Sequence, residues 1–240
     1  MSTISKQCDG RYLETAMSIV PPNYHAWILS TFEPYLKGTV AEVGAGSGNV
    51  SSHLLDKIEG KLIVIEPSEQ MFPVLEKRFL GNPRIVCEKK YFEDIAPQYK
   101  DSFDSIVYVN VLEHVENDQR ELSLAYDALK PGGTLCIFVP ALQFLFSEYD
   151  ASVGHYRRYH KNQLGKRMRD AGFEIRELKY FDIVGILPWL LLMKFLRLPL
   201  APHSVLLYDQ MIVPLMQKIE SLVHPPIGKN LIVVGRKPVH

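Results

Sequence analysis

The sequence has few cysteines, no excess of either charge and no long uninterrupted apolar run. Its three cysteines, Cys8, Cys87 and Cys136, are an odd number, and their spacing matches neither a disulfide framework nor a zinc site. Cys87 and Cys136 lie in apolar runs typical of strands, so we expect both to be buried, reduced thiols, which fits the cytoplasm. Lys and Arg together number 27, as do Asp and Glu. No net field therefore attracts the protein to nucleic acid or to an anionic membrane.

The most apolar stretch, residues 183–200, is interrupted by two prolines, a lysine and an arginine. A membrane-spanning helix needs about 20 nearly uninterrupted apolar residues. We therefore expect no transmembrane segment, and contact with a membrane surface stays open. The first 22 residues contain no basic region followed by an apolar run. The sequence thus predicts no signal peptide and a cytoplasmic location.

Short apolar runs alternate with amphipathic stretches through most of the chain. We predict strands at 40–43, 61–66, 85–87, 104–109, 134–139, 173–180 and 230–236, and helices at 13–19, 23–35, 49–58, 68–79, 118–129 and 161–171. This alternation predicts an α/β fold with a doubly wound, mostly parallel sheet. Asn23 is the expected N-cap of its helix. Two segments, 140–160 and 181–228, interrupt the alternation, and excursions of this length are often lids or binding loops.

The strongest motif is a glycine-rich loop at residues 42–49, Glu-Val-Gly-Ala-Gly-Ser-Gly-Asn, between a predicted strand and a predicted helix. Glycine lets the backbone turn sharply and approach a ligand, and the first N–H groups of the helix are free to bind it. A dinucleotide site needs a third glycine at Asn49, and a P-loop ends in Gly-Lys-Ser/Thr; both are absent. Glu66 ends the next strand, where a carboxylate can accept both ribose hydroxyls. S-adenosylmethionine, which has a ribose and no phosphate, fits this pattern.

Residues 42–49 resemble motif I of the class I S-adenosylmethionine-dependent methyltransferases. The resemblance, which is to a bacterial branch that acts on small molecules, covers residues 40–139. Glu66 matches the acidic ribose-binding position of that family. Residues 91–95 (YFEDI), 109–115 (VNVLEHV) and 129–135 (LKPGGTL) resemble its later motifs, in the same order and spacing. The break in the alternation at 181–228 predicts a helical lid inserted before the last strand. The resemblance implies a seven-stranded sheet of order 3-2-1-4-5-7-6 with strand 7 antiparallel. It also implies S-adenosyl-L-methionine as cofactor and S-adenosyl-L-homocysteine as product.

The resemblance divides the 240 residues of a single domain into four parts. These are an N-terminal helical cap (1–37), a cofactor-binding core (38–180), a helical insertion (181–228) and the last strand (229–240). It also implies a set of cofactor contacts: Glu42, Gly44, Ala45, Gly46, Gly48, Glu66, Pro67, Met71, Phe92, Asp94, Asn110 and Val111.

Three of these positions keep alternatives open. Glu42 either organises the loop around the methionine amino group or is a buried ion-pair partner. Met71 packs against the adenine or belongs to the core. Asp94 is favoured over Glu93 as the partner of the adenine amino group. A solvated loop carboxylate is the alternative for either of these last two.

Candidate catalytic groups gather in a polar run at 147–160, which resembles the D-x-x-x-G-H-x-R-R-Y stretch of the bacterial branch. We predict His155 as the base for a hydroxyl acceptor and Asp150 as the residue that orients it. His114 is the alternative base, and is otherwise structural. The sequence offers no ligand set for a metal ion.

Acceptor-binding residues are predicted on three segments. They are Tyr24 and Trp189, on the N-terminal helix and on the insertion, and Tyr156, Arg157 and Arg158 in the polar run. An arginine pair suits a carboxylate or phosphate on the acceptor, although we expect at least one of the two to be an ion-pair partner within the protein.

Together these features predict an enzyme that methylates an oxygen or nitrogen atom of a small or lipid-like metabolite, as a monomer or homodimer. Asn110-Val111-Leu112-Glu113 departs from the Asn-Pro-Pro-Tyr of adenine methylases, which argues against a nucleic acid acceptor. The alternatives are a peptide or protein methyltransferase and a non-catalytic cofactor-binding protein of the same fold. A nucleotide-linked oxidoreductase ranks last, because the third glycine is missing. The insertion at 181–228 is predicted to be a lid, a dimer face or a membrane-surface element.

Overall fold

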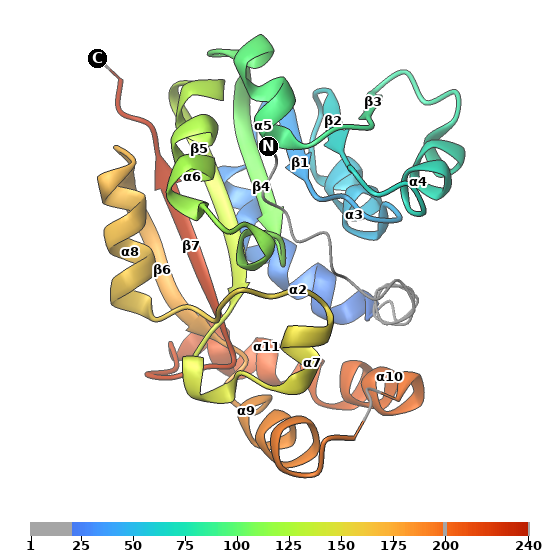
Figure 1. Ribbon diagram of the computed structural model, residues 1–240, viewed down its shortest axis with the longest axis vertical. Coiled ribbons are helices and arrows are strands. Elements are labelled where there is room, and N and C mark those ends of the chain that lie inside the picture. Colours follow the sequence, from blue (N-terminus) through green and yellow to red (C-terminus); the bar gives the residue numbers. More distant parts are fainter. Residues whose placement is uncertain (1–20, 199–200, 240) are drawn as a thin grey trace.

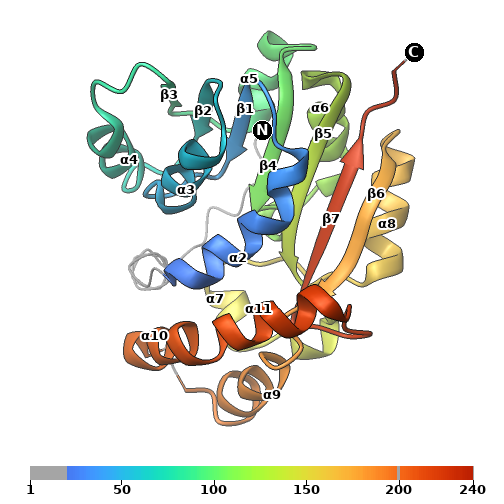
Figure 2. The same ribbon diagram turned by 180° about the vertical axis from the view of Figure 1, so that it is seen from behind.

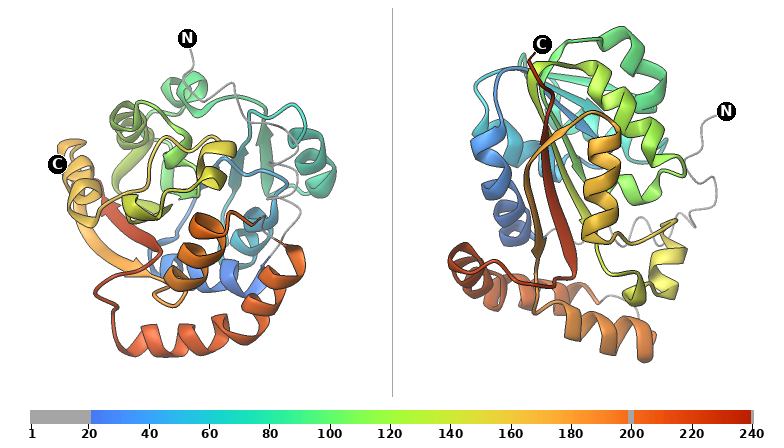
Figure 3. Two further views of the ribbon diagram at one scale, coloured as in Figure 1. Left: turned by 60° about the horizontal axis from the view of Figure 1, so that its bottom comes forward. Right: turned by 90° about the vertical axis from the view of Figure 1, so that its left-hand side faces the viewer.

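The computed structural model describes residues 21–198 and 201–239 (Figure 1). Cys8 and the helix predicted at 13–19 lie outside the described residues. Within them the chain forms one central sheet with helices packed on both of its faces, and a further group of helices crosses one end of the sheet (Figure 1, Figure 3).

The sheet has the predicted topology. Its strand order is β3-β2-β1-β4-β5-β7-β6, and β7 runs antiparallel to both of its neighbours. The other pairings, including those of β1 with β2 and β4, are parallel. The strands are β1 (Val40–Val43), β2 (Leu62–Ile65), β3 (Ile85–Glu88), β4 (Phe103–Val109), β5 (Leu129–Pro140), β6 (Glu174–Phe181) and β7 (Asn230–Arg236).

Two apolar clusters cover the two faces of the sheet, because successive residues of a strand point to opposite faces. In β1, Ala41 and Val43 belong to one cluster and Val40 belongs to the other. The first cluster packs against α5 (Phe92–Ile95), α6 (Asp118–Ala128) and α8 (Lys161–Asp170), and the second against α2 (Pro22–Phe32), α3 (Asn49–Lys57) and α4 (Phe72–Phe79). Figure 3 shows α6 and α8 on the opposite side of the sheet from α2. Strands buried on both faces explain why the runs of β1, β2 and β4 are almost wholly apolar.

Short helical turns link these elements. They are η1 (Glu33–Tyr35), η2 (Ala96–Tyr99), η3 (Leu112–His114), η4 (Gln143–Leu145) and α7 (Glu148–Ser152). The last two lie in the segment between β5 and α8, which the alternation of strands and helices does not account for. Ser147 and Asp150 form a capping box at the start of α7, so this segment is locally ordered by its own side chains.

Between β6 and β7 the chain forms the inserted segment, residues 181–228. It contains α9 (Ile186–Pro188), the π-helical η5 (Trp189–Phe195), α10 (Pro202–Met211) and α11 (Val213–Leu222). These helices cross the edge at which the parallel strands end, and α10 and α11 also contact α2 (Figure 2). Of the described helices, none has the length and apolarity that crossing a bilayer requires.

Asp182 anchors the inserted segment. Its side chain is fully buried and its backbone has φ +61°. Oδ1 accepts from Tyr208 Oη at 2.5 Å and from Gly185 N at 2.9 Å. Oδ2 accepts from Tyr24 Oη and pairs with Lys229 Nζ, both at 2.9 Å. Although burial acts to raise the pKa of Asp182, Lys229 and the hydroxyl donors hold it below its ordinary value. One carboxylate thus joins α2, α10 and the start of β7.

The structure corrects four local expectations. Asn23 does not cap α2, whose N-cap is Pro21; its side chain instead donates to Asp209, 186 residues away. Cys136 is buried, but Cys87 in the edge strand β3 is half-buried. The helix predicted from residue 68 begins at Phe72, since the Ser68 hydroxyl accepts backbone N–H groups in a preceding turn. The fifth strand begins at residue 129, because Leu129 pairs with β4 across a bulge.

Candidate active site

A cavity of about 680 Å³ lies where β1, β2, β4 and β5 end. This is the edge at which open α/β sheets bind ligands. Most of the predicted site residues form its wall: Tyr24, Glu42, Gly44, Ala45, Gly46, Glu66, Pro67, Phe92, Asn110, Val111, His114, His155, Arg158 and Trp189. The other predicted site residues are not among the described residues that line this cavity: Gly48, Met71, Asp94, Asp150, Tyr156 and Arg157.

The glycine loop between β1 and α3 follows a path that side chains would block. Gly44, Gly46 and Gly48 have φ of +71°, +56° and +82°. A Cβ on Gly44 would come within 2.5 Å of Val111 Cγ2, on the loop after β4. A Cβ on Gly48 would meet Phe79 and Leu75 of α4. Gly44 therefore lets two cavity-lining loops approach each other, whereas Gly48 lets α3 pack against α4.

Glu66 holds the loops after β1 and β2 together. Its Oε2 accepts from Gly46 N at 2.7 Å and its Oε1 from Ser68 N at 2.8 Å. Each oxygen keeps a further acceptor site, because an ionised carboxylate offers about four in all. Burial raises the pKa of Glu66, and the two backbone donors oppose that rise. The carboxylate is thus fixed at the cavity wall with capacity for hydroxyl donors.

Glu42 is the second carboxylate on this side of the cavity. It is 2% exposed, and its Oε2 has no hydrogen-bond partner among residues 21–198 and 201–239. Burial raises the pKa of Glu42 to about 8. The structure gives Glu42 no ion-pair partner within that range, so this alternative from the sequence finds no support there. The Ser51 hydroxyl opposes this rise in pKa, but the unpartnered Oε2 is suited to a ligand that brings a positive or donating group.

Two predicted cofactor contacts lie away from the cavity wall. Asp94 is exposed, in α5, while its neighbours Tyr91 and Phe92 line the cavity. Met71 is buried at the N-cap of α4. Their roles toward the adenine stay predictions.

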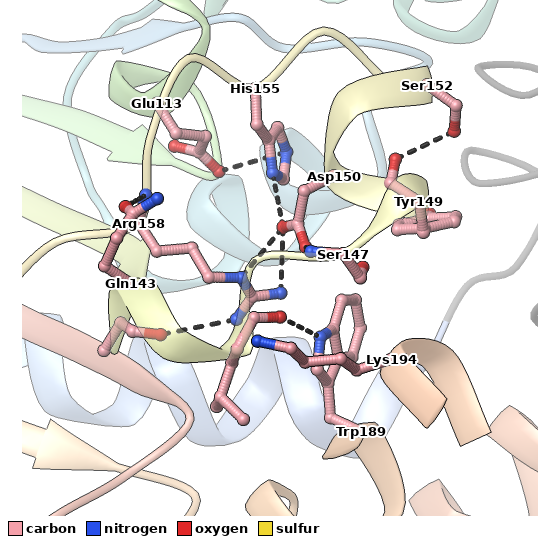
Figure 4. Close-up of polar contacts among 12 residues, drawn as sticks. Glu113, Gln143, Ser147, Tyr149, Asp150, Ser152, His155, Arg158, Trp189 and Lys194 are labelled. Carbon is pink, nitrogen blue, oxygen red and sulfur yellow. Dashed lines mark hydrogen bonds and ion pairs between the residues drawn. The ribbon is translucent and has the colours of Figure 1, made fainter. Parts of the chain in front are cut away.

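His155 and Asp150 form the dyad that the sequence predicts (Figure 4). His155 Nδ1 lies 2.9 Å from Asp150 Oδ1, and His155 is part of the cavity wall. The same Asp150 oxygen accepts from Arg158 Nε at 2.9 Å, and Oδ2 accepts from Ser147 N and Oγ at 2.8 Å. Burial acts to raise the pKa of Asp150, but His155 and Arg158 outweigh it and the pKa lies below its ordinary value. Asp150 is therefore a buried anion that orients the imidazole.

Glu113 is a group that sequence reasoning quoted within a motif without giving it a role. Its side chain is fully buried, and Oε1 lies 3.8 Å from His155 Nε2. The rings of His114 and His155 lie 4.6 Å apart at 79°. Burial raises the pKa of Glu113 to about 7 and lowers that of His114 to about 3. Glu113 and His114 thus both face His155, which comes from a distant part of the sequence.

Arg157 and Arg158 have different surroundings. Arg157 pairs with Asp118 at 2.9 Å and donates to the carbonyls of Val115 and Glu116. Arg158 is 3% exposed, pairs with Asp150, and lines the cavity. The expectation that at least one of the pair is an internal ion-pair partner therefore applies to both, and Arg158 alone also reaches the cavity.

Trp189 connects the inserted segment to the segment between β5 and α8. Its Nε1 donates to the carbonyl of Leu145 at 3.1 Å, and the guanidinium of Arg158 lies 4.5 Å from its ring centre. Lys229 Nζ lies 5.7 Å from the same ring and also lines the cavity. Lys229 was missed in the sequence, where only its place directly before a predicted strand could have indicated it.

Comparisons with known proteins agree with this geometry. Residues 19–178 match a family model described as a methyltransferase domain. An uncharacterized methyltransferase of Schizosaccharomyces pombe is 27% identical over 124 residues, which cover 52% of this chain and 47% of that protein. A ubiquinone biosynthesis O-methyltransferase of Xanthomonas campestris is 26% identical over 166 residues, 62% of this chain and 67% of that one. The chain thus spans about half the length of the first relative and two thirds of the second.

The fold has solved counterparts. An S-adenosylmethionine-dependent methyltransferase of Thermotoga maritima has a TM-score of 0.62 and 23% identity, with 95% of this chain and 96% of that chain covered. At this level of identity the likeness concerns the fold, and it extends over the inserted segment as well as the sheet.

Proposed function

The chain belongs to the class I S-adenosylmethionine-dependent methyltransferases, and from this premise we propose that it methylates an oxygen or nitrogen atom of a small or lipid-like metabolite. The cofactor is S-adenosylmethionine. The observation that carries the acceptor assignment is the cavity of about 680 Å³, which adjoins both the glycine loop and the His155–Asp150 dyad. This volume lies within the range of ordinary small-molecule sites, which is about 300–1,000 Å³.

The cofactor is held on the side of the cavity formed by the loops after β1, β2 and β4. Glu66, fixed by Gly46 and Ser68, would accept the ribose hydroxyls. Glu42, buried without a partner on its Oε2, would meet the amino group of the methionine moiety. Phe92 and Val111 supply apolar parts of the wall here. When bound, the cofactor supplies an electrophilic methyl group on a sulfonium.

The acceptor occupies the opposite side, between His155, Arg158 and Trp189. The Asp150 carboxylate stabilises one tautomer of His155, in which Nδ1 carries the proton and Nε2 is free to take a proton from the acceptor. Arg158 and Trp189 restrict where the acceptor lies, which aligns its nucleophile with the methyl group. Arg158 is buried and the His155 side chain is only 11% exposed, which limits the access of water to the reacting atoms.

Calorimetric titration with S-adenosylmethionine, S-adenosylhomocysteine and NAD tests the cofactor. Binding of the first two at one site per chain, without binding of NAD, is the expected result. A screen of phenolic, amino and lipid-like acceptors then tests the acceptor class, read as S-adenosylhomocysteine formed. Tight cofactor binding without turnover on any acceptor would favour the non-catalytic alternative. Turnover confined to peptides would favour the protein-directed one.

The surface of the inserted segment bears on the partners. It exposes large apolar side chains, with Leu187, Phe195, Met211 and Leu222 each at least 66% exposed. This composition is compatible with a lid, a dimer face or a membrane-surface element. Light scattering and vesicle co-flotation separate these cases: a dimer mass supports the second, and co-flotation supports the third. The free thiols of Cys87 and Cys136 are compatible with the cytoplasm.

A further inference from the structure

Three potential metal ligands meet beside the cavity. One carboxylate oxygen of Glu113 and one ring nitrogen from each of His114 and His155 lie within 4.8 Å of one another. Glu113 and His114 come from η3, after β4, and His155 comes from the turn after α7. Two of the three groups, His114 and His155, line the cavity. The cluster therefore lies between the chain's interior and the space proposed for the acceptor.

Glu113 is the anomalous member of this cluster. It is fully buried, and no donor from another described residue lies within hydrogen-bond distance of either oxygen. His155 Nε2 approaches only to 3.8 Å (Figure 4). A buried carboxylate without donors is unfavourable when ionised, and the acid form would also lack an acceptor for its proton. A cation between Glu113 and the two imidazoles would remove this imbalance.

Both imidazoles are already oriented as metal ligands usually are. His155 Nδ1 is hydrogen-bonded to the Asp150 carboxylate, which leaves Nε2 free on the side of Glu113. His114 has the backbone of Gly154 as a hydrogen-bond partner, and one of its ring nitrogens belongs to the cluster. A metal-bound histidine almost always donates its other N–H to a carboxylate or a backbone carbonyl. Asp150 is in turn fixed by Arg158 and Ser147, so the support extends one layer further.

We propose that Glu113, His114 and His155 bind a divalent transition-metal ion that coordinates and activates a hydroxyl group of the acceptor. Two imidazoles with one carboxylate suit Zn²⁺, Mn²⁺ or Fe²⁺, whereas Mg²⁺ and Ca²⁺ prefer oxygen ligands throughout. Three protein ligands leave at least one position open toward the cavity. This inference rests on the proposed methyltransferase function and deepens it, because it assigns the acceptor to O-methylation.

The chemistry balances without a further reactant. A coordinated hydroxyl ionises near neutral pH, and its proton passes to solvent. A lone pair of that oxygen forms the bond to the methyl carbon, and the electrons of the carbon–sulfur bond remain on sulfur. In this arrangement His155 is a ligand, so the cation takes over the activation that the metal-free mechanism gives to His155 as base. The two mechanisms differ in their response to a chelator.

Metal binding to the full chain tests the site directly. The chelator-treated protein is titrated with Co²⁺ alone and with Zn²⁺ alone, by calorimetry and by the visible absorption of Co²⁺. One ion per chain is expected, with the intense absorption of a four- or five-coordinate site. Glu113→Gln and His155→Gln should each weaken binding at least about 100-fold, since even the groups behind metal ligands are worth about 10–100-fold.

Two matched variants control for loss of a buried carboxylate and for adventitious imidazole binding. Glu121→Gln removes a buried carboxylate that accepts from Tyr108, and His160→Ala removes an exposed histidine outside the cluster. Both should bind Co²⁺ as the parent does. Absence of binding in the parent, or equal binding in the Glu113 and His155 variants, overturns the proposal.

If those variants do not fold, X-ray absorption of the Zn²⁺-loaded parent tests the site instead. Two imidazoles and only nitrogen and oxygen neighbours are expected, and a sulfur neighbour or a single imidazole contradicts the site. S-adenosylmethionine titrations on the same samples separate the two proposals. Cofactor binding and chelator-insensitive turnover without metal binding would leave the methyltransferase function standing and refute the metal site. Metal binding without cofactor binding would support the metal site and refute the methyltransferase function.

Discussion

The two sides of the cavity are built by different means. The cofactor side is made largely of backbone: alternating glycines with positive φ, and a carboxylate held by N–H groups of adjacent loops. The acceptor side is made of side chains from distant parts of the sequence, with Glu113, His155, Trp189 and Lys229 brought together by the fold. A backbone cradle leaves a continuous motif in the sequence, whereas a cluster of side chains leaves scattered residues. Separate variants on each side should therefore separate cofactor affinity from turnover.

The largest effect is expected at His155. The His155→Ala change removes either a base or a metal ligand, so turnover should fall about 10²–10⁴-fold. The affinity for S-adenosylmethionine should stay within about twofold, because no described contact links His155 to the glycine loop. Steady-state kinetics and calorimetry measure the two quantities, with His160→Ala as the matched control. A parallel loss of cofactor affinity would mean that the two sides are not independent.

Substitution of Asp182, which anchors the inserted segment, tests whether the acceptor side depends on that anchor. The Asp182→Asn change leaves Lys229 without its counter-charge in a mostly buried site. Removing one partner of a buried pair costs about 3–5 kcal/mol of unfolding free energy, and the partial exposure of Lys229 places this pair near the lower end. The thermal midpoint should fall and the KM for the acceptor should rise more than the Kd for the cofactor. Asp56→Asn, at an exposed position of α3, should change neither; an equal loss there would show a nonspecific effect of the charge.

On the cofactor side, Glu66→Ala should weaken S-adenosylmethionine binding by about 1–3 kcal/mol, through loss of charge-assisted hydrogen bonds. Turnover at saturating cofactor should be largely kept. Titration calorimetry measures the affinity, and Glu69→Ala, an exposed neighbour, is the control. Unchanged affinity would remove Glu66 from the ribose site.

Glu42, on the cofactor side, makes the stability of the protein depend on pH. Its pKa in the folded protein is about 8, above the ordinary value of 4.5, chiefly because of burial. A raised carboxyl pKa means that stability is highest below the unfolded value and is lost as pH rises toward the folded one. Glu42→Gln should therefore be more stable than the parent by about 1–2 kcal/mol above pH 8, with little difference near pH 5. Chemical denaturation at the two pH values measures this, and an equal gain at both would reject burial of the charge as the cause.

The sequence predicts the sheet well and the inserted segment poorly, for physical reasons. Strands 40–43 and 230–236 were predicted with their observed bounds, since a strand buried on both faces is a short apolar run between turn residues. No helix bounds were predicted within the inserted segment, because prolines, among them Pro188, Pro199 and Pro214, interrupt its apolar residues. Asn23 was misassigned because its partner, Asp209, is distant in sequence.

The same reasoning explains which site residues were found. Gly44 and Glu66 are readable because one cofactor imposes one backbone geometry. Arg157 and Arg158 are adjacent in sequence, yet they turn to Asp118 and Asp150 respectively, which no local pattern indicates. Glu113 was visible only as part of a motif, because its meaning depends on the fold bringing His155 to within 3.8 Å.

The two ends of the inserted segment meet. Phe181 pairs with Asn230 in the sheet, and Lys229 N donates to the carbonyl of Asp182 at 3.1 Å. A segment that leaves and re-enters a sheet at neighbouring points can be lengthened, shortened or replaced without changing the register of any strand. Evolution can therefore replace the part of the acceptor wall that the inserted segment supplies, which includes Trp189, while the cofactor wall is inherited unchanged. Grafting the corresponding segment of a relative between residues 182 and 229 would turn this scaffold into a platform for new specificities.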